Sequence, residues 1–278
     1  MLNRRVFLYG LPTAALSAYG YAQFIEPRWL EDTQKTVVTG RGLKRPLRIL
    51  HLSDFHAAAI VPVSFVEESL RRGMAMKPDI VCLTGDFVTT DNDFDAARYE
   101  SALQICSAVC PTFAVVGNHD GGVWAARAGW FPTSTFIRQL AARGGVRVLH
   151  NDAVKIEVAG TRLWVVGVGD WWSEELRAPL AFANVKDDGD PVVLLSHNPD
   201  GKEDCKFFRW DLMLSGHTHG GQVMIPFYGP PIVPVLDKRY AVGLNRFEDR
   251  WIHTTRGVGN IRGIRVNCRP EVSLLIVT

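Results

Sequence analysis

Five short apolar runs along the chain each end in aspartate, asparagine or histidine, in most cases directly beside glycine. Runs of four to eight apolar residues bounded by turn residues are typical of buried strands. Because the carboxyl ends of strands in an α/β sheet meet at one crevice, these polar side chains are predicted to converge. The motifs are Asp54-Phe-His56, Gly85-Asp86, Gly117-Asn118-His119-Asp120, Ser196-His197-Asn198 and Gly216-His217-Thr218-His219.

The segments between these runs alternate between helical and extended patterns. In the first half, helical spacing separates the strand-like runs, an order typical of crossover connections. Past Gly145 short strand-like runs follow one another, for which antiparallel pairing is expected. We predict one α/β domain with two sheets stacked face to face between helices. Helices are expected over residues 63–76, 94–110 and 135–143, strands over 48–53, 79–84, 112–116, 146–149, 153–158, 162–168, 192–195, 211–214 and within 240–278, and a polar connector over 31–45.

The first 30 residues differ in composition from the rest of the chain. Arg4 and Arg5 precede a stretch from Val6 to Ile25 that contains no charged residue. A basic start followed by apolar and small residues is typical of an export signal, and residues 3–8 resemble a bacterial twin-arginine signal. A retained membrane anchor is the alternative, although Pro12 disfavours it. We expect residues 1–30 to be a signal or anchor and the protein to reach the periplasm or the outer face of the cytoplasmic membrane.

The strand-end residues offer a mixed set of nitrogen and oxygen donors. Seven donors are too many for one tetrahedral zinc ion and suit two ions that share a bridging carboxylate, for which Asp86 is the natural candidate. Imidazole and carboxylate together suit Mn, Fe, Zn or Ni. We therefore predict two divalent cations. The predicted ligands are Asp54, His56, Asp86, Asn118, His197, His217 and His219.

The five motifs resemble, in the same order, those of the calcineurin-like metallophosphoesterase superfamily. Further strings resemble the smaller YaeI/YkuE group of bacterial phosphodiesterases, so the resemblance extends over nearly the whole chain. It implies a four-layer α/β/β/α sandwich of two mixed sheets flanked by helices, formed by residues 31–278. The additional strings occupy residues 196–200, 216–222, 237–240, 255–259 and 268–271.

The resemblance also implies a division of roles among the site residues. His119 would not bind metal but would stabilise or protonate the leaving oxygen, and Asp120 would orient it through a hydrogen bond. The implied reaction is hydrolysis of a phosphate ester, with a diester preferred, by in-line attack of a metal-bridging hydroxide. One metal would be held by Asp54, His56, Asp86 and His219, and the other by Asp86, Asn118, His197 and His217.

Several alternatives remain open at this point. Hydrolysis of a lipid-linked pyrophosphate such as UDP-2,3-diacylglucosamine, or of a phosphomonoester, would use the same donors. A metal-free binding scaffold would be expected to have lost ligands, and none is lost. A net charge of +2 gives no reason to expect a nucleic-acid partner. The candidate partners are a phosphodiester or lipid-linked phosphate and a membrane surface; the oligomeric state is not indicated.

A few other residues have less specific interpretations. His51, His150 and His253 match no motif and are interpreted as ordinary strand residues. Trp171 and Trp172 are interpreted as core or rim packing, with an apolar substrate channel as the alternative. The five cysteines include no C-x-x-C pair and are interpreted as small buried residues. Four basic residues follow the N-terminal segment and are candidates for contact with anionic lipid: Arg41, Lys44, Arg45 and Arg48.

Overall fold

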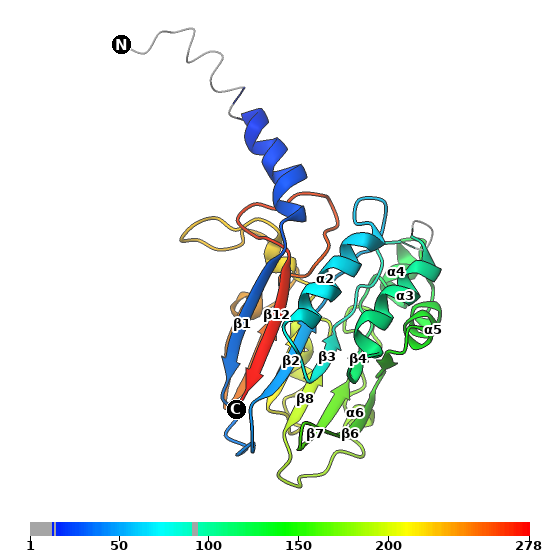
Figure 1. Cartoon of the computed structure of the whole chain (residues 1–278), viewed down its shortest axis with the longest axis vertical. Coiled ribbons are helices and arrows are strands. Elements are labelled where there is room, and N and C mark those ends of the chain that lie inside the picture. The colour runs from blue at the N-terminus through cyan, green and yellow to red at the C-terminus, as the bar shows by residue number, and fades with distance from the viewer. Residues whose placement is uncertain (1–12, 14, 91–93) are drawn as a thin grey trace.

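Two six-stranded sheets pack face to face in the computed structural model, which describes residues 13, 15–90 and 94–278 (Figure 1). The arginine pair Arg4-Arg5 and residues 6–12 and 14 of the uncharged stretch lie outside these residues. The first sheet has the order β1-β12-β2-β3-β4-β5, with β1 Glu31–Val37, β12 Glu271–Val277, β2 Leu47–Leu52, β3 Ile80–Leu83, β4 Thr112–Ala114 and β5 Arg147–Val148. The second has the order β10-β11-β9-β8-β7-β6, with β10 Gly243–Phe247, β11 Arg250–Thr254, β9 Leu212–Ser215, β8 Val192–Leu195, β7 Thr161–Gly167 and β6 Asp152–Val158.

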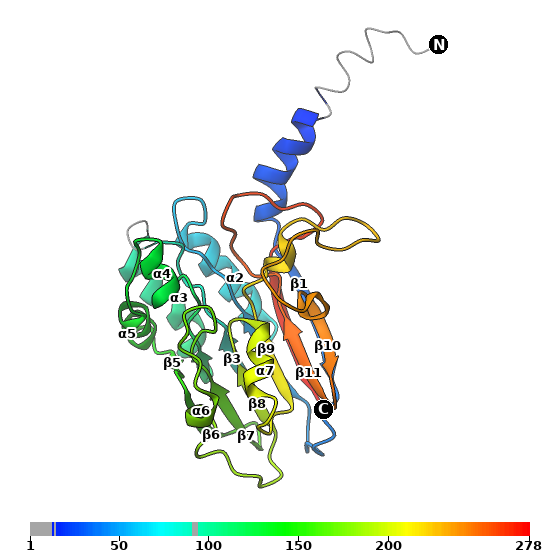
Figure 2. The ribbon, with the colours of Figure 1, turned by 180° about the vertical axis from the view of Figure 1, so that it is seen from behind.

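Alternation of side chains along the central strands creates the layers. In β2, Ile49 packs into the core between the two sheets, whereas Leu50 and Leu52 pack against the helices outside the first sheet. A third apolar cluster covers the outer face of the second sheet. The predicted four-layer sandwich of two mixed sheets is therefore confirmed. The first helical layer contains α2 Val63–Ala75, α3 Ala96–Ser107, α4 Val123–Arg127 and α5 Thr135–Arg143, and the second contains α6 Ala178–Ala181 and α7 Lys202–Cys205 (Figures 1 and 2).

Two sequence predictions about the strands are wrong. Residues 31–37 are not a connector but strand β1, which pairs in parallel with β12 from Glu31↔Glu271 to Val37↔Val277. The segment is polar because it is an edge strand, and Val37 is its one fully buried residue. The second half is also not mainly antiparallel, since β7, β8, β9 and β11 run parallel to their neighbours in that order. Among the described strands of the second sheet, antiparallel pairing occurs in the β6–β7 and β10–β11 hairpins, and β12 pairs antiparallel with β2 in the first sheet.

The end of the N-terminal segment packs against the body of the protein. Residues 15–20 are helical and continue into the helical turns Tyr21–Ile25 and Glu26–Arg28. Arg265 N donates to Ala22 O (3.0 Å), and the buried Glu26 carboxylate accepts a hydrogen bond from Cys268 N. The Leu30 side chain is fully buried. None of the helices within the described ranges is long and apolar enough to cross a membrane.

The basic residues that follow this segment lie at the opposite end of the molecule. Strand β1 carries the chain along the length of the sheet, so the β1–β2 connection lies beside the C-terminus rather than beside the N-terminal helix (Figure 1). There Arg41 pairs with Asp211 (2.6 Å) and Arg45 with Asp79 (2.7 Å). The hypothesis that Arg41, Lys44, Arg45 and Arg48 face the same lipid as the N-terminal segment is therefore wrong.

The packing of Ala22 to Leu30 predicts different outcomes for two truncations. Deleting residues 1–20 should leave the melting temperature close to that of the full chain, because none of the contacts above is removed. Deleting residues 1–30 removes the buried Leu30 side chain, a loss of the kind that costs about 2–5 kcal/mol, and should lower the melting temperature by about 5 °C or more. Calorimetry of both proteins tests this, and equal melting temperatures would contradict it.

Candidate metal centre

The five predicted motifs meet at one edge of the sandwich. Strands β2, β3 and β4 are parallel neighbours in the first sheet, and β8 and β9 are parallel neighbours in the second. Each ends within three residues of the start of one motif, so the polar side chains of both sheets face a common space. All seven predicted ligands are buried, with exposed fractions between 0 and 5%. The structure therefore brings together every residue that the sequence nominated as a ligand.

A first group of donors comes from the loops after β2, β3 and β9. His56 Nε2 lies 3.0 Å from His219 Nε2 and 3.3 Å from Asp86 Oδ2. The Asp54 Oδ1 atom lies 3.3 Å from His219 Nε2. These atoms face one another across a gap between side chains that belong to three separate strand ends.

A second group of donors shares Asp86 with the first. Asp86 Oδ2 lies 3.2 Å from His197 Nε2, which in turn lies 3.2 Å from Asn118 Oδ1 and 3.3 Å from His217 Nδ1. The other oxygen of Asp86 accepts a hydrogen bond from His119 N (2.9 Å), which fixes the orientation of the carboxylate. A single oxygen of Asp86 thus belongs to both groups.

The chemistry of these donors fits divalent cations. Ligand atoms about 2.1 Å from an ion lie roughly 3.0–3.4 Å apart in octahedral or tetrahedral geometry, close to the distances between the donors of each group. Two imidazole nitrogens in contact can share only one proton. His56 Nδ1, His219 Nδ1 and His217 Nε2 are buried and have no hydrogen-bond partner among the residues that the structure describes. The groups Asp54-His56-His219 and Asp86-His197-His217 each place their ligand atoms within 4.8 Å of one another.

The backbone at the site is held in an uncommon conformation. Five of the seven nominated ligands are non-glycine residues with a positive φ: Asp54 (54°), His56 (48°), Asp86 (52°), His217 (68°) and His219 (49°). Such residues cost about 1–3 kcal/mol each and concentrate at functional sites. Two neighbouring glycines are required for space, because a methyl group at Gly216 would collide with the Asp54 carboxylate and one at Gly117 with Asp86.

Burial and neighbouring charge set the protonation of the donors. Burial lowers the pKa of His217 to about 3 and that of His219 well below its usual value, which keeps both rings neutral and able to bind metal at neutral pH. Burial also opposes charge on His197, but the adjacent Asp86 carboxylate outweighs it and raises the pKa of His197 well above its usual value.

His119 lies beside the first group of donors, and one of its ring nitrogens lies within 4.8 Å of ligand atoms of His56 and Asp86. Its ring is 4.7 Å from that of His56, and its Nδ1 lies 3.0 Å from the Thr89 carbonyl oxygen, so Nδ1–H donates and Nε2 carries the lone pair. Burial lowers the pKa of His119 to about 4.

The hydrogen bond predicted between Asp120 and His119 is not present. The buried Asp120 carboxylate instead accepts from Phe87 N and Gly117 N, both at 2.8 Å. Asp120 therefore ties the loop after β3 to the loop after β4, while the Thr89 carbonyl orients the His119 ring. Burial raises the pKa of Asp120 to about 8. The correction has a simple cause: two free backbone N–H groups in adjacent tight turns lie within reach of this carboxylate.

Three tryptophans form a wall around the donors, which we call the tryptophan wall: Trp124, Trp130 and Trp172. The rings of Trp124 and Trp130 lie 4.6 and 5.0 Å from that of His119, and Trp172 lies 4.3 Å from His217. Trp171, by contrast, donates to Asp204 at the rim. Sequence reasoning did not single out Trp124 or Trp130, and the available signal was their position four and ten residues after Asp120, the last residue of the third motif.

Two other buried groups beside the site also escaped the sequence analysis. His51 and His253, interpreted as ordinary strand residues, contact each other through their Nδ1 atoms (2.8 Å) between the sheets, and His51 also contacts Thr84 Oγ1 (2.9 Å). The Thr84 carbonyl in turn contacts His197 Nδ1 (2.6 Å). Asp170, whose pKa burial raises to about 6, has one oxygen without a partner. These residues form a buried polar cluster next to His197.

Comparison with known proteins agrees with this geometry. Residues 47–221, which contain all five motifs, match the calcineurin-like phosphoesterase family. The chain is 38% identical over 278 residues to phosphodiesterase YaeI of Escherichia coli, covering 99% of both chains. It is 28% identical to metallophosphoesterase YkuE of Bacillus subtilis (98% of this chain, 96% of the relative) and 25% identical to UDP-2,3-diacylglucosamine pyrophosphatase LpxG of Chlamydia muridarum (97% and 96%).

The converging donors and the family match define a metal-dependent phosphoesterase. The chain belongs to the calcineurin-like phosphoesterase family, and within it is similar over its full length to the bacterial proteins YaeI and YkuE.

The shared position of Asp86 predicts distinct metal contents for two variants. Asp86→Ala should lose most bound metal, because its Oδ2 belongs to both donor groups, whereas Asn118→Ala should weaken only the group that contains His197. Metal per chain, measured by mass spectrometry after gel filtration, should fall in the order parent, Asn118→Ala, Asp86→Ala. His150→Ala, which lies outside both groups, should match the parent. Parent-like metal content in Asp86→Ala would contradict the assignment.

Proposed function

We propose that the protein is a phosphodiesterase that hydrolyses its substrate at two divalent cations. Mn, Fe, Zn and Ni are the candidates that the mixed donor set favours. The observation that carries the proposal is the pair of donor groups joined by one oxygen of Asp86. One cation would be held by Asp54, His56, Asp86 and His219, and the other by Asp86, Asn118, His197 and His217. Bound cations of this kind neutralise phosphate charge and activate water for attack on phosphorus.

The residues of the chain supply positioning and proton transfer. Asn118 is a neutral ligand, so the site would keep a positive charge that attracts a phosphate anion. His119 faces the site with an unprotonated Nε2, and the negative charge of a bound phosphate would favour its protonated form. The imidazolium would then stabilise or protonate the leaving oxygen while Nδ1–H stays bonded to Thr89. Asp120 acts as a positioning residue for the loops that hold Asp86 and Asn118.

Preference for a diester is supported by the 38% identity to a protein named as a phosphodiesterase. Hydrolysis of a lipid-linked pyrophosphate is a second candidate, favoured by the similarity to LpxG and by the tryptophan wall, which would accept an apolar group beside the phosphate. Turnover of an aryl phosphodiester, an aryl phosphomonoester and a lipid-linked pyrophosphate, compared with the same metal-loaded protein, separates these candidates.

The role given to His119 predicts a leaving-group dependence. His119→Ala should retain its metals yet turn over an alkyl phosphodiester roughly 10²–10⁴-fold more slowly, because the alkoxide must be protonated as it leaves. A nitrophenyl diester, whose leaving group needs no proton, should be affected much less. Comparison of kcat for both substrates is the measurement, and His51→Asn, altered behind the metal centre, is the control for indirect effects. An equal loss on the two substrates would assign His119 to positioning alone.

We further propose that the protein is exported in its folded state, to the periplasm or the outer face of the cytoplasmic membrane. The adjacent arginines and the uncharged stretch after them support this. Loading metal before export would fix which ion is bound, since Zn and Cu outcompete Mn and Fe at most nitrogen and oxygen sites.

Paired conservative substitutions test the route of export. Arg4→Lys with Arg5→Lys keeps the charge but removes the arginine pair, and should retain the protein in the cytoplasm. Arg41→Lys with Arg45→Lys, at the far end of the fold, should be exported like the parent. Fractionation of a bacterial host that has the twin-arginine route measures both. Normal export of the first variant would refute the twin-arginine assignment.

A further inference from the structure

An uncharged loop emerges directly from the metal-binding motif after β9. Residues 223–236 contain only apolar residues, glycine, proline and one tyrosine. Phe227 is fully exposed, and Ile232 and Leu236 are 81% and 78% exposed. Large apolar side chains that gather on a surface mark an interaction site, because water contact with them is unfavourable.

The helical N-terminal segment adds a second apolar surface at the same end of the molecule. Leu16, Phe24 and Ile25 are exposed by more than half. Residues 265–266 connect the two segments. Arg265 N donates to Ala22 O in the helix, and Met224 N in the loop donates to Val266 O. Figures 1 and 2 show the helix and the loop at the same end of the sandwich. We call the exposed apolar residues of the N-terminal helix and the loop the docking face, which includes Leu16, Phe24, Ile25, Phe227, Ile232 and Leu236.

The exposed charges of the N-terminal helix and of the loops beside it have one sign, and an acid, Glu68 on α2, lies at the edge of this surface. In the described residues of 13–30, 223–236 and 257–264, the exposed ionic groups are Arg28 and Arg262, and the one acid, Glu26, is buried. An apolar surface bordered by cations is complementary to an anionic phospholipid bilayer, which takes apolar side chains below the headgroups and attracts arginine at their level.

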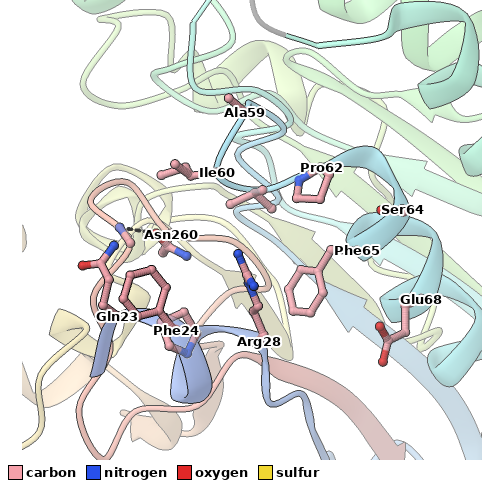
Figure 3. A pocket seen from close by; sticks show the side chains of 13 residues that line it. Gln23, Phe24, Arg28, Ala59, Ile60, Pro62, Ser64, Phe65, Glu68 and Asn260 are labelled. Atoms are coloured by element: carbon pink, nitrogen blue, oxygen red, sulfur yellow. Dashed lines mark hydrogen bonds between the residues drawn. The ribbon is translucent and has the colours of Figure 1, made fainter. Parts of the chain in front are cut away.

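A cavity of about 630 Å³ opens in the docking face between the N-terminal helix and α2. Figure 3 shows the Arg28 side chain between the rings of Phe24 and Phe65, with Ile60 across the opening. No hydrogen bond or ion pair holds the Arg28 guanidinium within the ranges that the structure describes, although Glu68 on α2 lines the same cavity. A cationic group among apolar walls suits a phosphate with an attached acyl chain.

The docking face is continuous with the metal centre. Gly221, two residues after His219, packs so closely against Pro230 and Val233 that a methyl group there would collide with the loop. At the other end of the loop, Leu236 N donates to the buried Asp200 carboxylate (2.8 Å). The loop is therefore anchored at both ends on the motifs that carry the donors.

We propose that the docking face binds the surface of an anionic phospholipid bilayer. The uncharged sequence that leads into the helix continues the same chemistry, which favours a bilayer over a folded protein partner. The metal centre then faces the headgroup level, where the tryptophan wall meets substrates that remain embedded in the bilayer. The proposal that the protein binds a bilayer depends on the docking face alone, whereas hydrolysis of embedded substrates also rests on the proposed function.

Site-specific fluorescence distinguishes insertion of the loop from attachment by the N-terminus. An environment-sensitive dye is placed on full-length Phe227→Cys, and on Phe207→Cys as a matched control, since Phe207 is 85% exposed and lies beside the β1–β2 connection at the opposite end. The equally treated parent corrects for Cys110, the one native cysteine that is not fully buried. Vesicles of phosphatidylcholine with phosphatidylglycerol should shift the emission at position 227 to the blue and protect it from an aqueous quencher. No change at 227, or equal changes at 227 and 207, would overturn the proposal.

Sedimentation with the same vesicles measures the contribution of the loop. Phe227→Ser with Ile232→Ser should lower the partition constant of the protein between water and vesicles by about tenfold or more, because two apolar side chains no longer enter the bilayer. Phe207→Ser with Leu180→Ser removes comparable exposed groups elsewhere and should bind like the parent. Vesicles of phosphatidylcholine alone should bind the parent more weakly. Parent-like binding of the loop variant, or no effect of the anionic lipid, would contradict the proposal.

Turnover of a soluble aryl phosphodiester is followed in the same samples. It should be equal in the parent and the loop variant, since neither substituted residue contacts the donors. A parent that binds vesicles but hydrolyses no phosphate ester would refute the proposed function and leave the docking face intact. A parent that hydrolyses the soluble diester but ignores vesicles would do the reverse.

Discussion

The confinement of seven nitrogen and oxygen donors, each within 3.0–3.3 Å of a neighbouring donor, is the constraint on which the rest of the structure depends. Buried donors of this kind have been removed from water, and their lone pairs repel each other unless protons or cations lie between them. The two sheets supply the force that holds them, since each donor follows a strand whose side chains are buried in the cores on both faces. Left-handed backbone at five donors adds further cost. Metal binding would offset both terms, so metal affinity and folding stability are coupled here.

Sequence reasoning succeeded where the chemistry of a residue type and its place at a strand end carried the information. The motifs placed every nominated ligand, because few residue types bind cations and because parallel strands end at a common edge. Sequence reasoning failed where a residue distant in the sequence determines the local structure. The polar segment β1 shows no strand pattern of its own, because it becomes a strand through its pairing with β12 at the other end of the chain. The acceptor role of Asp120 depends on the turns at Phe87 and Gly117, which no local pattern reveals.

The N-terminal segment shows how composition and packing can point in different directions. An uncharged stretch with the composition of a removable signal leads directly into residues whose polar groups form hydrogen bonds with the body of the protein. Glu26 is buried and satisfies Cys268 N, and Arg269 stacks on the Trp29 ring at 4.1 Å while it donates to the Trp29 and Leu30 carbonyls. A segment with these contacts stabilises the loop after β11. Composition alone could not separate the exposed helical part from the packed part, because large apolar side chains occur in both.

One stretch of chain, from Gly216 to Leu236, connects the metal centre with the docking face. Its first residues supply His217 and His219, and its later residues form the exposed loop, with Gly221 packed against the loop between them. Because His217 contacts the ring of Trp172, displacement of the loop would be transmitted to the tryptophan wall as well as to the donors. The apolar loop and the metal site are parts of one structural unit.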